Sequence, residues 1–177
     1  MSEKTTNKRA KIGDIVEFAT KNGLAYAHYT HENPTFGGVV RVFDVLHPVR
    51  PADFSEVAQG PVRFTTLFPV KIVVPRGLLK VVGHANIAPG NQPFPTFRKS
   101  NGDPRKLSDD WWFFEGEDLV RVGKITPEQR KYPLLQMWNE AMMIERIESG
   151  WTPETDWMWT GRAKPELEEA RNSRIDH

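Results

Sequence analysis

The chain of 177 residues contains no cysteine, and this absence removes several kinds of chemistry at once. Disulfide bonds, thiolate metal sites and cysteine nucleophiles are excluded, and a reducing compartment is allowed. No apolar run approaches the roughly 18 residues that a membrane helix needs. The opening segment MSEKTTNKRAKIGD also lacks the apolar core of a secretion signal. We therefore expect a cytoplasmic protein with no membrane partner.

An excess of charge of one sign is also missing, because 24 Lys and Arg face 23 Asp and Glu and leave a formal net charge of +1. This balance exerts no global attraction on nucleic acid or on an anionic membrane. Residues 1–11 are polar and basic, so we expect them to be disordered. Residues 161–177 are charged with hardly any apolar stripe, which predicts a charged helix or tail. The intervening residues 12–160 are expected to form a single domain.

Short β-branched segments separated by turn residues predict a sheet over residues 12–122. The turn Lys21-Asn22-Gly23 favours a hairpin that pairs residues 15–18 with residues 24–30. Residues 39–46 are apolar on both faces, which is typical of a buried central strand. About seven short strands predict a strongly bent antiparallel sheet or half-barrel. The remaining expected strands are 62–67, 70–74, 78–82, 111–114 and 119–122.

The residue pattern changes after residue 125 and predicts helices over residues 126–160. Thr126 and Gln129 have the spacing of a capping box, with Pro at the first helical position. Apolar residues at three- and four-residue spacing between Leu134 and Ser149 form a broad helical face, which Gly150 ends. A second short helix is expected to start at Thr152. We expect these C-terminal helices to pack on the sheet, so the predicted fold class is α+β.

The segment His28-Tyr-Thr-His31-Glu32 suggests a metal site, but its spacing argues against one. In a regular strand, positions 28 and 31 face opposite sides, so the two rings cannot converge on one ion. The segment also differs from His-Glu-x-x-His. We expect strand-surface histidines with no metal, and a face of Tyr26, His28 and Thr30 as a weaker candidate for partner contacts.

Motifs for catalysis and for cofactor binding do not stand out either. There is no P-loop, no Gly-x-Ser-x-Gly elbow and no Gly-x-Gly-x-x-Gly turn. None of the serines lies in a recognisable catalytic arrangement. We therefore predict no catalytic residue and no cofactor.

Five acids and no Lys or Arg lie between positions 109 and 118. Paired carboxylates can perform acid–base chemistry, but a hairpin tip is wet and pKa shifts there are small. A solvated edge is one interpretation, and an acidic patch that binds a basic partner is the sharper one. Because adjacent strand residues face opposite sides, at most one of the two tryptophans in this segment should be exposed. The predicted partner-binding residues are Asp109, Asp110, Trp111, Trp112, Glu115, Glu117 and Asp118.

Nucleic-acid binding is the main alternative that the residues suggest. Aromatic side chains on a bent sheet, together with basic side chains, can stack on bases and contact phosphates. Here the basic residues cluster in one loop flanked by acids, without an aromatic RNA-binding signature, so nucleic acid is not the expected partner. The residues concerned are Tyr26, Phe64, Phe94 and Phe97, with Arg98, Lys99, Arg105 and Lys106.

Glycine and aromatic residues follow a characteristic order between about Lys11 and Val122. The segments that show it are 11–17, 23–29, 36–42, 81–84, Pro93-x-Pro95-x-Phe97, Trp111-Trp112 and the Glu-Gly turn that follows. This order resembles the immunity protein 26 family of bacterial polymorphic toxin systems. The resemblance implies a non-enzymatic protein that binds a cognate toxin domain and blocks it, and it supplies no catalytic residue. A nucleic-acid-binding or regulatory β-module and an uncharacterised hydrolase remain alternatives, and no feature indicates an oligomeric state.

Overall fold

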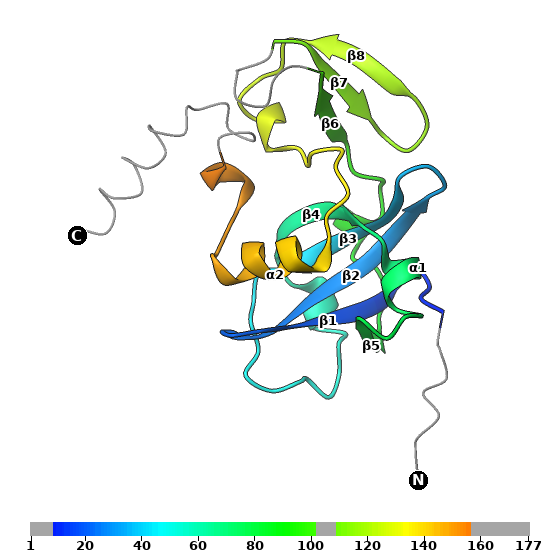
Figure 1. Cartoon of the computed structure of the whole chain (residues 1–177), viewed down its shortest axis with the longest axis vertical. Coiled ribbons are helices and arrows are strands. Elements are labelled where there is room, and N and C mark those ends of the chain that lie inside the picture. Colours follow the sequence, from blue (N-terminus) through cyan, green and yellow to red (C-terminus); the bar gives the residue numbers. More distant parts are fainter. Residues whose placement is uncertain (1–8, 102–108, 157–177) are drawn as a thin grey trace, which may run out of the picture. The chain divides into compact units, whose positions relative to one another are not determined.

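The computed structural model describes residues 9–101 and 109–156, and the chain divides into two compact units (Figure 1). The first unit combines the chain up to Phe94 with residues 136–150, and the second combines residues 95–135 with the chain from Trp151 onward. The tail predicted at 161–177 and residues 1–8 of the predicted disordered N-terminus lie outside the described residues. Ala10, which was expected in that disordered segment, is buried at 7% exposure.

The first unit is built on a five-stranded antiparallel sheet in the order β4-β3-β2-β1-β5. The predicted hairpin is confirmed, because Thr20 pairs with Gly23 across the two-residue turn Lys21-Asn22. Gly23 supplies the positive φ of 130° that this turn requires. The predicted central strand is also confirmed, since β3 lies between β2 and β4 and is buried along most of its length. The strands are β1 (Asp14–Thr20), β2 (Gly23–Asn33), β3 (Gly37–Phe43), β4 (Val62–Phe68) and β5 (Lys80–His84).

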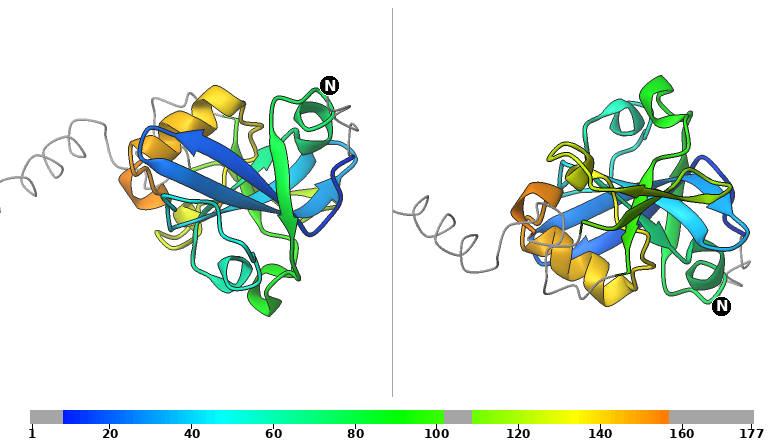
Figure 2. Two further views of the ribbon diagram at one scale, coloured as in Figure 1. Left: turned by 90° about the horizontal axis from the view of Figure 1, so that it is seen from below. Right: turned by 90° about the horizontal axis from the view of Figure 1, so that it is seen from above.

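Apolar side chains cover both faces of the five-stranded sheet. On one face, Ile15, Tyr26 and Phe43 pack with Phe54 and Ala58, which belong to the connection that contains the short 3-10 helix η1 (Val57–Gln59). The helix α2 (Glu140–Glu148) packs against β1 from the other side of the sheet (Figure 2). The buried side chains on that second face include Phe18, Phe64, Phe68, Trp138, Met143 and Ile147.

The strand predicted at residues 70–74 is wrong, because this segment forms the short helix α1 (Val70–Val73). The N–H groups of Ile72 and Val73 both donate to the carbonyl of Pro69, and Val74 N–H donates to the carbonyl of Val70. These local bonds satisfy the backbone without a neighbouring strand. β-branched side chains favour a strand, but the turn after Pro69 overrides that preference. A second 3-10 helix, η2 (Pro89–Asn91), follows β5.

The second unit contains a three-stranded antiparallel sheet in the order β6-β7-β8. Its strands are β6 (Phe97–Ser100), β7 (Trp111–Phe114) and β8 (Leu119–Gly123), so the predicted hairpin of residues 111–114 and 119–122 is confirmed. The mixed α+β composition is confirmed. The expected single bent sheet is replaced by two sheets, and neither closes into a barrel.

The helices predicted from residue 126 are shorter than expected. Thr126 and Gln129 form the predicted capping pair, since each side chain accepts from the other residue's N–H, but only the 3-10 helix η3 (Gln129–Lys131) follows. The helix predicted from Leu134 is wrong over its first residues, because Leu135 N–H donates to the carbonyl of Arg98 and Trp138 N–H donates to that of Leu67. The regular helix α2 begins only at Glu140, and η4 (Pro153–Thr155) follows it. No helix among the described residues has the length and apolarity needed to cross a membrane.

Candidate partner-binding surface

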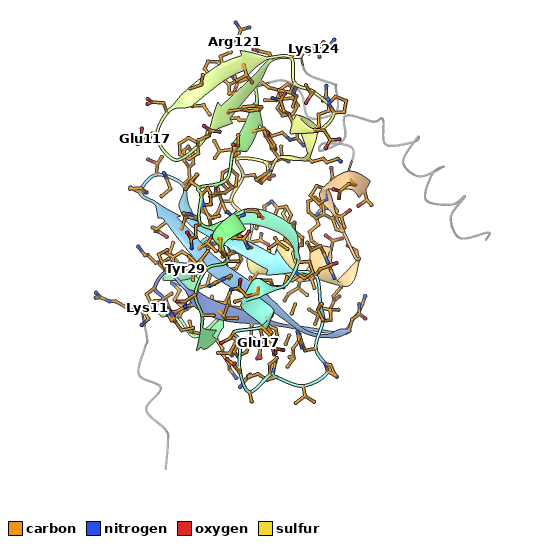
Figure 3. All side chains as sticks on the ribbon, turned by 180° about the vertical axis from the view of Figure 1, so that it is seen from behind. Lys11, Glu17, Tyr29, Glu117, Arg121 and Lys124 are labelled. Carbon is orange, nitrogen blue, oxygen red and sulfur yellow. The ribbon has the colours of Figure 1, made fainter. Side chains whose placement is uncertain are left out.

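The hairpin of β7 and β8 turns through Glu115-Gly-Glu-Asp118, and its three acids form what we call the acidic tip. Glu115, Glu117 and Asp118 are all exposed, and Glu117 lies at the turn of the hairpin (Figure 3). Glu115 accepts a hydrogen bond from Thr96 Oγ1 at 2.6 Å. Within the described part of the chain, Glu117 and Asp118 make no side-chain hydrogen bond or ion pair. The tip therefore presents two exposed carboxylates whose charge is not neutralised by any cation of residues 9–101 or 109–156.

The two acids that precede β7 differ from those of the tip. Asp110 forms an ion pair with Arg121, with 2.7 Å between Oδ1 and Nε. Its charge is thus balanced by a side chain of the adjacent strand. Asp109 is exposed and lies next to residues outside the described range. The structure therefore separates the predicted acidic set into an unneutralised tip and a paired acid at the other end of the hairpin.

The two tryptophans of β7 face opposite sides of the sheet, as alternation along a strand requires. Trp111 is only 5% exposed, and the guanidinium of Arg98 stacks 4.6 Å from the centre of its ring. Trp112 is half-buried and shares the other face with Lys99 and Arg121, which lie opposite it on the neighbouring strands. Trp111 is therefore wrong as a partner anchor, whereas Trp112 remains accessible in part.

The nucleic-acid alternative loses most of its residues in the folded chain. Arg98 is completely buried and donates from Nε to the carbonyl of Tyr132 at 3.0 Å. Burial lowers the pKa of Arg98, and the nearby charge of Arg130 lowers it further. Three of the four aromatic residues proposed for stacking lie in the interior, namely Tyr26, Phe64 and Phe97. Phe94 is half-buried and packs edge-on against His31, while Arg105 and Lys106 lie outside the described residues.

Strand β8 is an open edge that the sequence pattern did not single out. The side chains of Leu119, Val120 and Val122 are 37%, 56% and 40% exposed. Within the described chain only β7 pairs with β8, whereas the outer edge of β6 is occupied by residues 133–135, which bond to Arg98. A strand whose apolar residues face solvent on both sides shows no alternation of apolar and polar residues in its sequence. The segment's hydrophobicity therefore predicted a strand but not its exposure.

The prediction that His28 and His31 face opposite sides is wrong because of an irregularity in β2. His28 lies opposite Arg41 and His31 lies opposite Val39, and the register slips by one residue between them. Since alternate residues of β3 share a face, both histidines lie on the same face. Even so, the described residues contain no group of three His, Cys, Asp or Glu that could hold a metal ion.

The two histidines are held by backbone carbonyls. His28 is completely buried, with Nε2 3.2 Å from the carbonyl oxygen of Ala85, and His31 Nε2 lies 2.7 Å from that of Gln92. Burial lowers the pKa of both rings. The expected strand-surface position is therefore wrong for His28. Tyr26 and Thr30 are buried too, so the weaker candidate face does not exist as a surface.

Arg41 lies beside His31 and holds the same stretch of chain. Its Nη2 donates to the carbonyls of Asn91 and Pro93 at 3.2 and 3.1 Å. Burial lowers the pKa of Arg41. Together the two side chains fix residues 91–93 on the sheet through three consecutive carbonyls, which is a structural role.

Asp14 and His84 form a polar pair that sequence reasoning missed. Asp14 is completely buried and accepts from the N–H of Lys11, while its Oδ1 lies 3.0 Å from His84 Nδ1. The side chain of His84 is 50% exposed. A buried carboxylate that orients an accessible imidazole is part of many hydrolase sites. In the described residues, however, no hydroxyl group is bonded to His84, and the hydrolase alternative stays a prediction.

No protein-family model matches the chain, and neither a curated protein nor a solved structure does. The resemblance to the immunity protein 26 family therefore stays a prediction.

Proposed function

We propose that the chain is a non-enzymatic binding protein that neutralises a toxin domain by covering a basic surface with its acidic tip. The observation that carries this proposal is the exposure of Glu117 and Asp118 without a neutralising partner in the described chain. Both residues lie on a short hairpin whose strands are paired in a three-stranded sheet, so the charges are held in fixed positions. The toxin class comes from the family resemblance.

Electrostatics supports an acidic tip as a recognition element. Complementary charge speeds the encounter of two proteins and fixes their register, while truncation of a contact that becomes buried mainly raises the dissociation rate. Toxins that cleave nucleic acid need a basic surface to hold phosphates, so an immunity protein with exposed acids is a natural complement. Trp112 is a half-buried aromatic residue of β7 that lies opposite the exposed residues Lys99 and Arg121, and it is the proposed anchor.

The test uses a tagged full-length chain to capture a partner from native cells, with mass spectrometry to identify a toxin-like domain. Binding of the purified partner is then measured for the double variant Glu117→Lys/Asp118→Lys. We expect its dissociation constant to rise at least roughly tenfold, mostly through a slower association rate that depends on salt.

A control variant with the same change of charge separates the effect of a local contact on affinity from the effect of net charge. Glu56→Lys/Glu154→Lys reverses two exposed acids outside the hairpin and should leave the affinity within about twofold. Equal effects of the two double variants, or no effect of the tip variant, would contradict the acidic tip as the binding site.

A further inference from the structure

The connection between β4 and β5 exposes two large aliphatic side chains. It contains the short helix α1, and Ile72 and Leu78 are 52% and 55% exposed. Exposed apolar side chains that lie together can mark an interaction or membrane surface, whereas isolated ones are ordinary. We infer that this connection contacts the surface of an anionic lipid membrane, with Ile72 and Leu78 inserted among the headgroups. This inference depends neither on the toxin partner nor on the acidic tip.

The backbone brings the two side chains together. The N–H of Leu78 donates to the carbonyl of Val73 at 3.1 Å, and that of Gly77 donates to the carbonyl of Val74 at 3.0 Å. Gly77 has a φ of 71°, so these bonds form the Schellman motif that ends a helix with a left-handed residue. In this motif the residue at the position of Leu78 commonly packs on apolar residues of the preceding turn, here Ile72 and Val73. Ile72 and Leu78 therefore form one protruding apolar point.

The charge around this apolar point is basic. Residues 57–102 contain six Lys and Arg and no Asp or Glu. Lys71 and Arg76 flank Ile72 along the chain and are exposed, and Arg76 forms no ion pair within the described residues. Lys71 lies 3.4 Å from a carboxylate oxygen of Glu32, but its side chain stays 55% exposed. The near-zero net charge of the whole chain therefore conceals a local excess of positive charge.

The segment that precedes β1 adds to this charge. The N–H of Gly13 donates to the carbonyl of Tyr29 at 2.8 Å, and the hydroxyl of Tyr29 donates to the carboxylate that pairs with Lys71. The start of the described chain therefore lies beside α1 (Figures 1 and 2). Lys11 is exposed there and belongs to the basic segment of residues 1–11, in which four Lys and Arg face one Glu.

A lipid surface fits this combination of side chains better than other anionic surfaces do. Nucleic acid is bound by cations together with stacking aromatic residues, and residues 69–80 contain no aromatic residue. A bilayer favours both features, because aliphatic side chains enter the boundary between headgroups and acyl chains while Lys and Arg stay with the acidic headgroups. One short turn buries little apolar area, so the contact is weak and reversible. The sequence predicted no membrane partner because net charge and apolar runs do not report a local patch.

The first test measures the binding of the full-length chain to lipid vesicles by flotation. Vesicles of phosphatidylcholine with about 30% phosphatidylserine should bind the wild type at low salt, and pure phosphatidylcholine should bind it at least roughly tenfold less. Ile72→Ser/Leu78→Ser should lower the partition coefficient for the anionic vesicles at least roughly tenfold. Arg76→Glu should lower it at least about fivefold, because it removes a cation and adds an anion at the lipid surface.

Matched variants separate the patch from general effects of hydrophobicity and charge. Val45→Ser/Val49→Ser removes two valines that are 52% and 75% exposed in another connection of the same unit. Lys124→Glu reverses an exposed cation of the second unit. Both should leave the partition coefficient within about twofold. Equal losses in the patch and control variants, or a wild type that does not bind the anionic vesicles, would overturn the inference.

The second test uses the absence of cysteine from the chain. Leu78→Cys and its control Val49→Cys each carry one environment-sensitive fluorophore in the full-length chain. Anionic vesicles should shift the emission of the first to the blue and leave that of the second unchanged, because only the first label enters the bilayer. A shift at both labels or at neither would contradict the proposal. Failure to bind vesicles, combined with capture of an acidic protein that requires Ile72 and Leu78, would also overturn it and assign the patch to a protein partner.

Discussion

At the scale of single residues, buried and half-buried polar side chains hold connecting segments to the sheets. Arg41 and His31 bind the carbonyls of residues 91–93, and Arg98 binds the carbonyl of Tyr132 while it stacks on Trp111. Each of these side chains appears in the sequence as an ordinary polar residue of a strand. Their burial depends on which distant segment covers them, and local periodicity carries no information about that.

His28 leads to a prediction about pH at this scale. Burial holds its folded pKa below the ordinary value of 6.5, so below that pH the unfolded chain takes up a proton that the folded chain does not. The free energy of unfolding should therefore fall as the pH drops below 6.5, by at most about 1.4 kcal/mol per pH unit for this group. Urea unfolding between pH 7.5 and 4.5 measures the slope.

The matched variant is His28→Gln, whose amide nitrogen can still donate to the Ala85 carbonyl but does not titrate. Its slope should be smaller than that of the wild type, and a remainder should persist because burial lowers the pKa of His31 as well. Identical slopes in the two proteins would show that His28 gains its proton equally in both states.

At the scale of elements, the sequence predicted the hairpins well and the helices poorly. β1–β2 and β7–β8 are hairpins of strands that are adjacent in sequence. Their turn residues predict them, namely Lys21-Asn22-Gly23 and the Glu-Gly turn. Residues 134–138 have helical spacing of apolar side chains but are extended, because their N–H groups bond to Arg98 and Leu67. Those acceptors are distant in sequence, so the choice between helix and extended chain could not be made locally.

The late start of α2 leads to a prediction about its cap. The side chain of Asn139 accepts from Met142 N–H at 2.8 Å, which satisfies one of the unpaired donors of the first turn. Asn139→Ala should lower the free energy of unfolding by about 1 kcal/mol. Asn139→Ser keeps an acceptor and should cost much less. Urea unfolding of both variants tests this, and equal losses would mean that the side chain acts through some contact other than the cap.

At the scale of the whole molecule, the candidate surface could be predicted only in part. The acidic turn was found because charge is visible in the sequence, and Glu117 and Asp118 are indeed exposed. Trp111 could not be separated from Trp112, because strand alternation says that one is buried but not which one. The open edge of β8 was missed altogether, since edge position is a property of the sheet order and not of the strand's own residues.

The interleaving of the two units along the chain leads to the last prediction. Residues 136–150 belong to the first unit although residues 95–135 separate them from the rest of it. They contribute Trp138, Met143 and Ile147, which are 3%, 0% and 2% exposed. Burial of three such side chains is worth about 5 kcal/mol, which is comparable to the whole stability of a small domain. A fragment that ends at Phe94 should therefore not fold.

Residues 9–94 joined to residues 136–150 by a flexible linker of about 10 residues should restore a cooperative urea transition. The joined fragment with Met143→Asp provides the control, because it keeps the length and the linker but places a charge in the core. Circular dichroism of the three fragments separates the possibilities. If only the full-length chain folds, residues 12–160 behave as the single domain that the sequence predicts. If the joined fragment folds and its Asp variant does not, the first unit is an independent folding unit that is completed by α2.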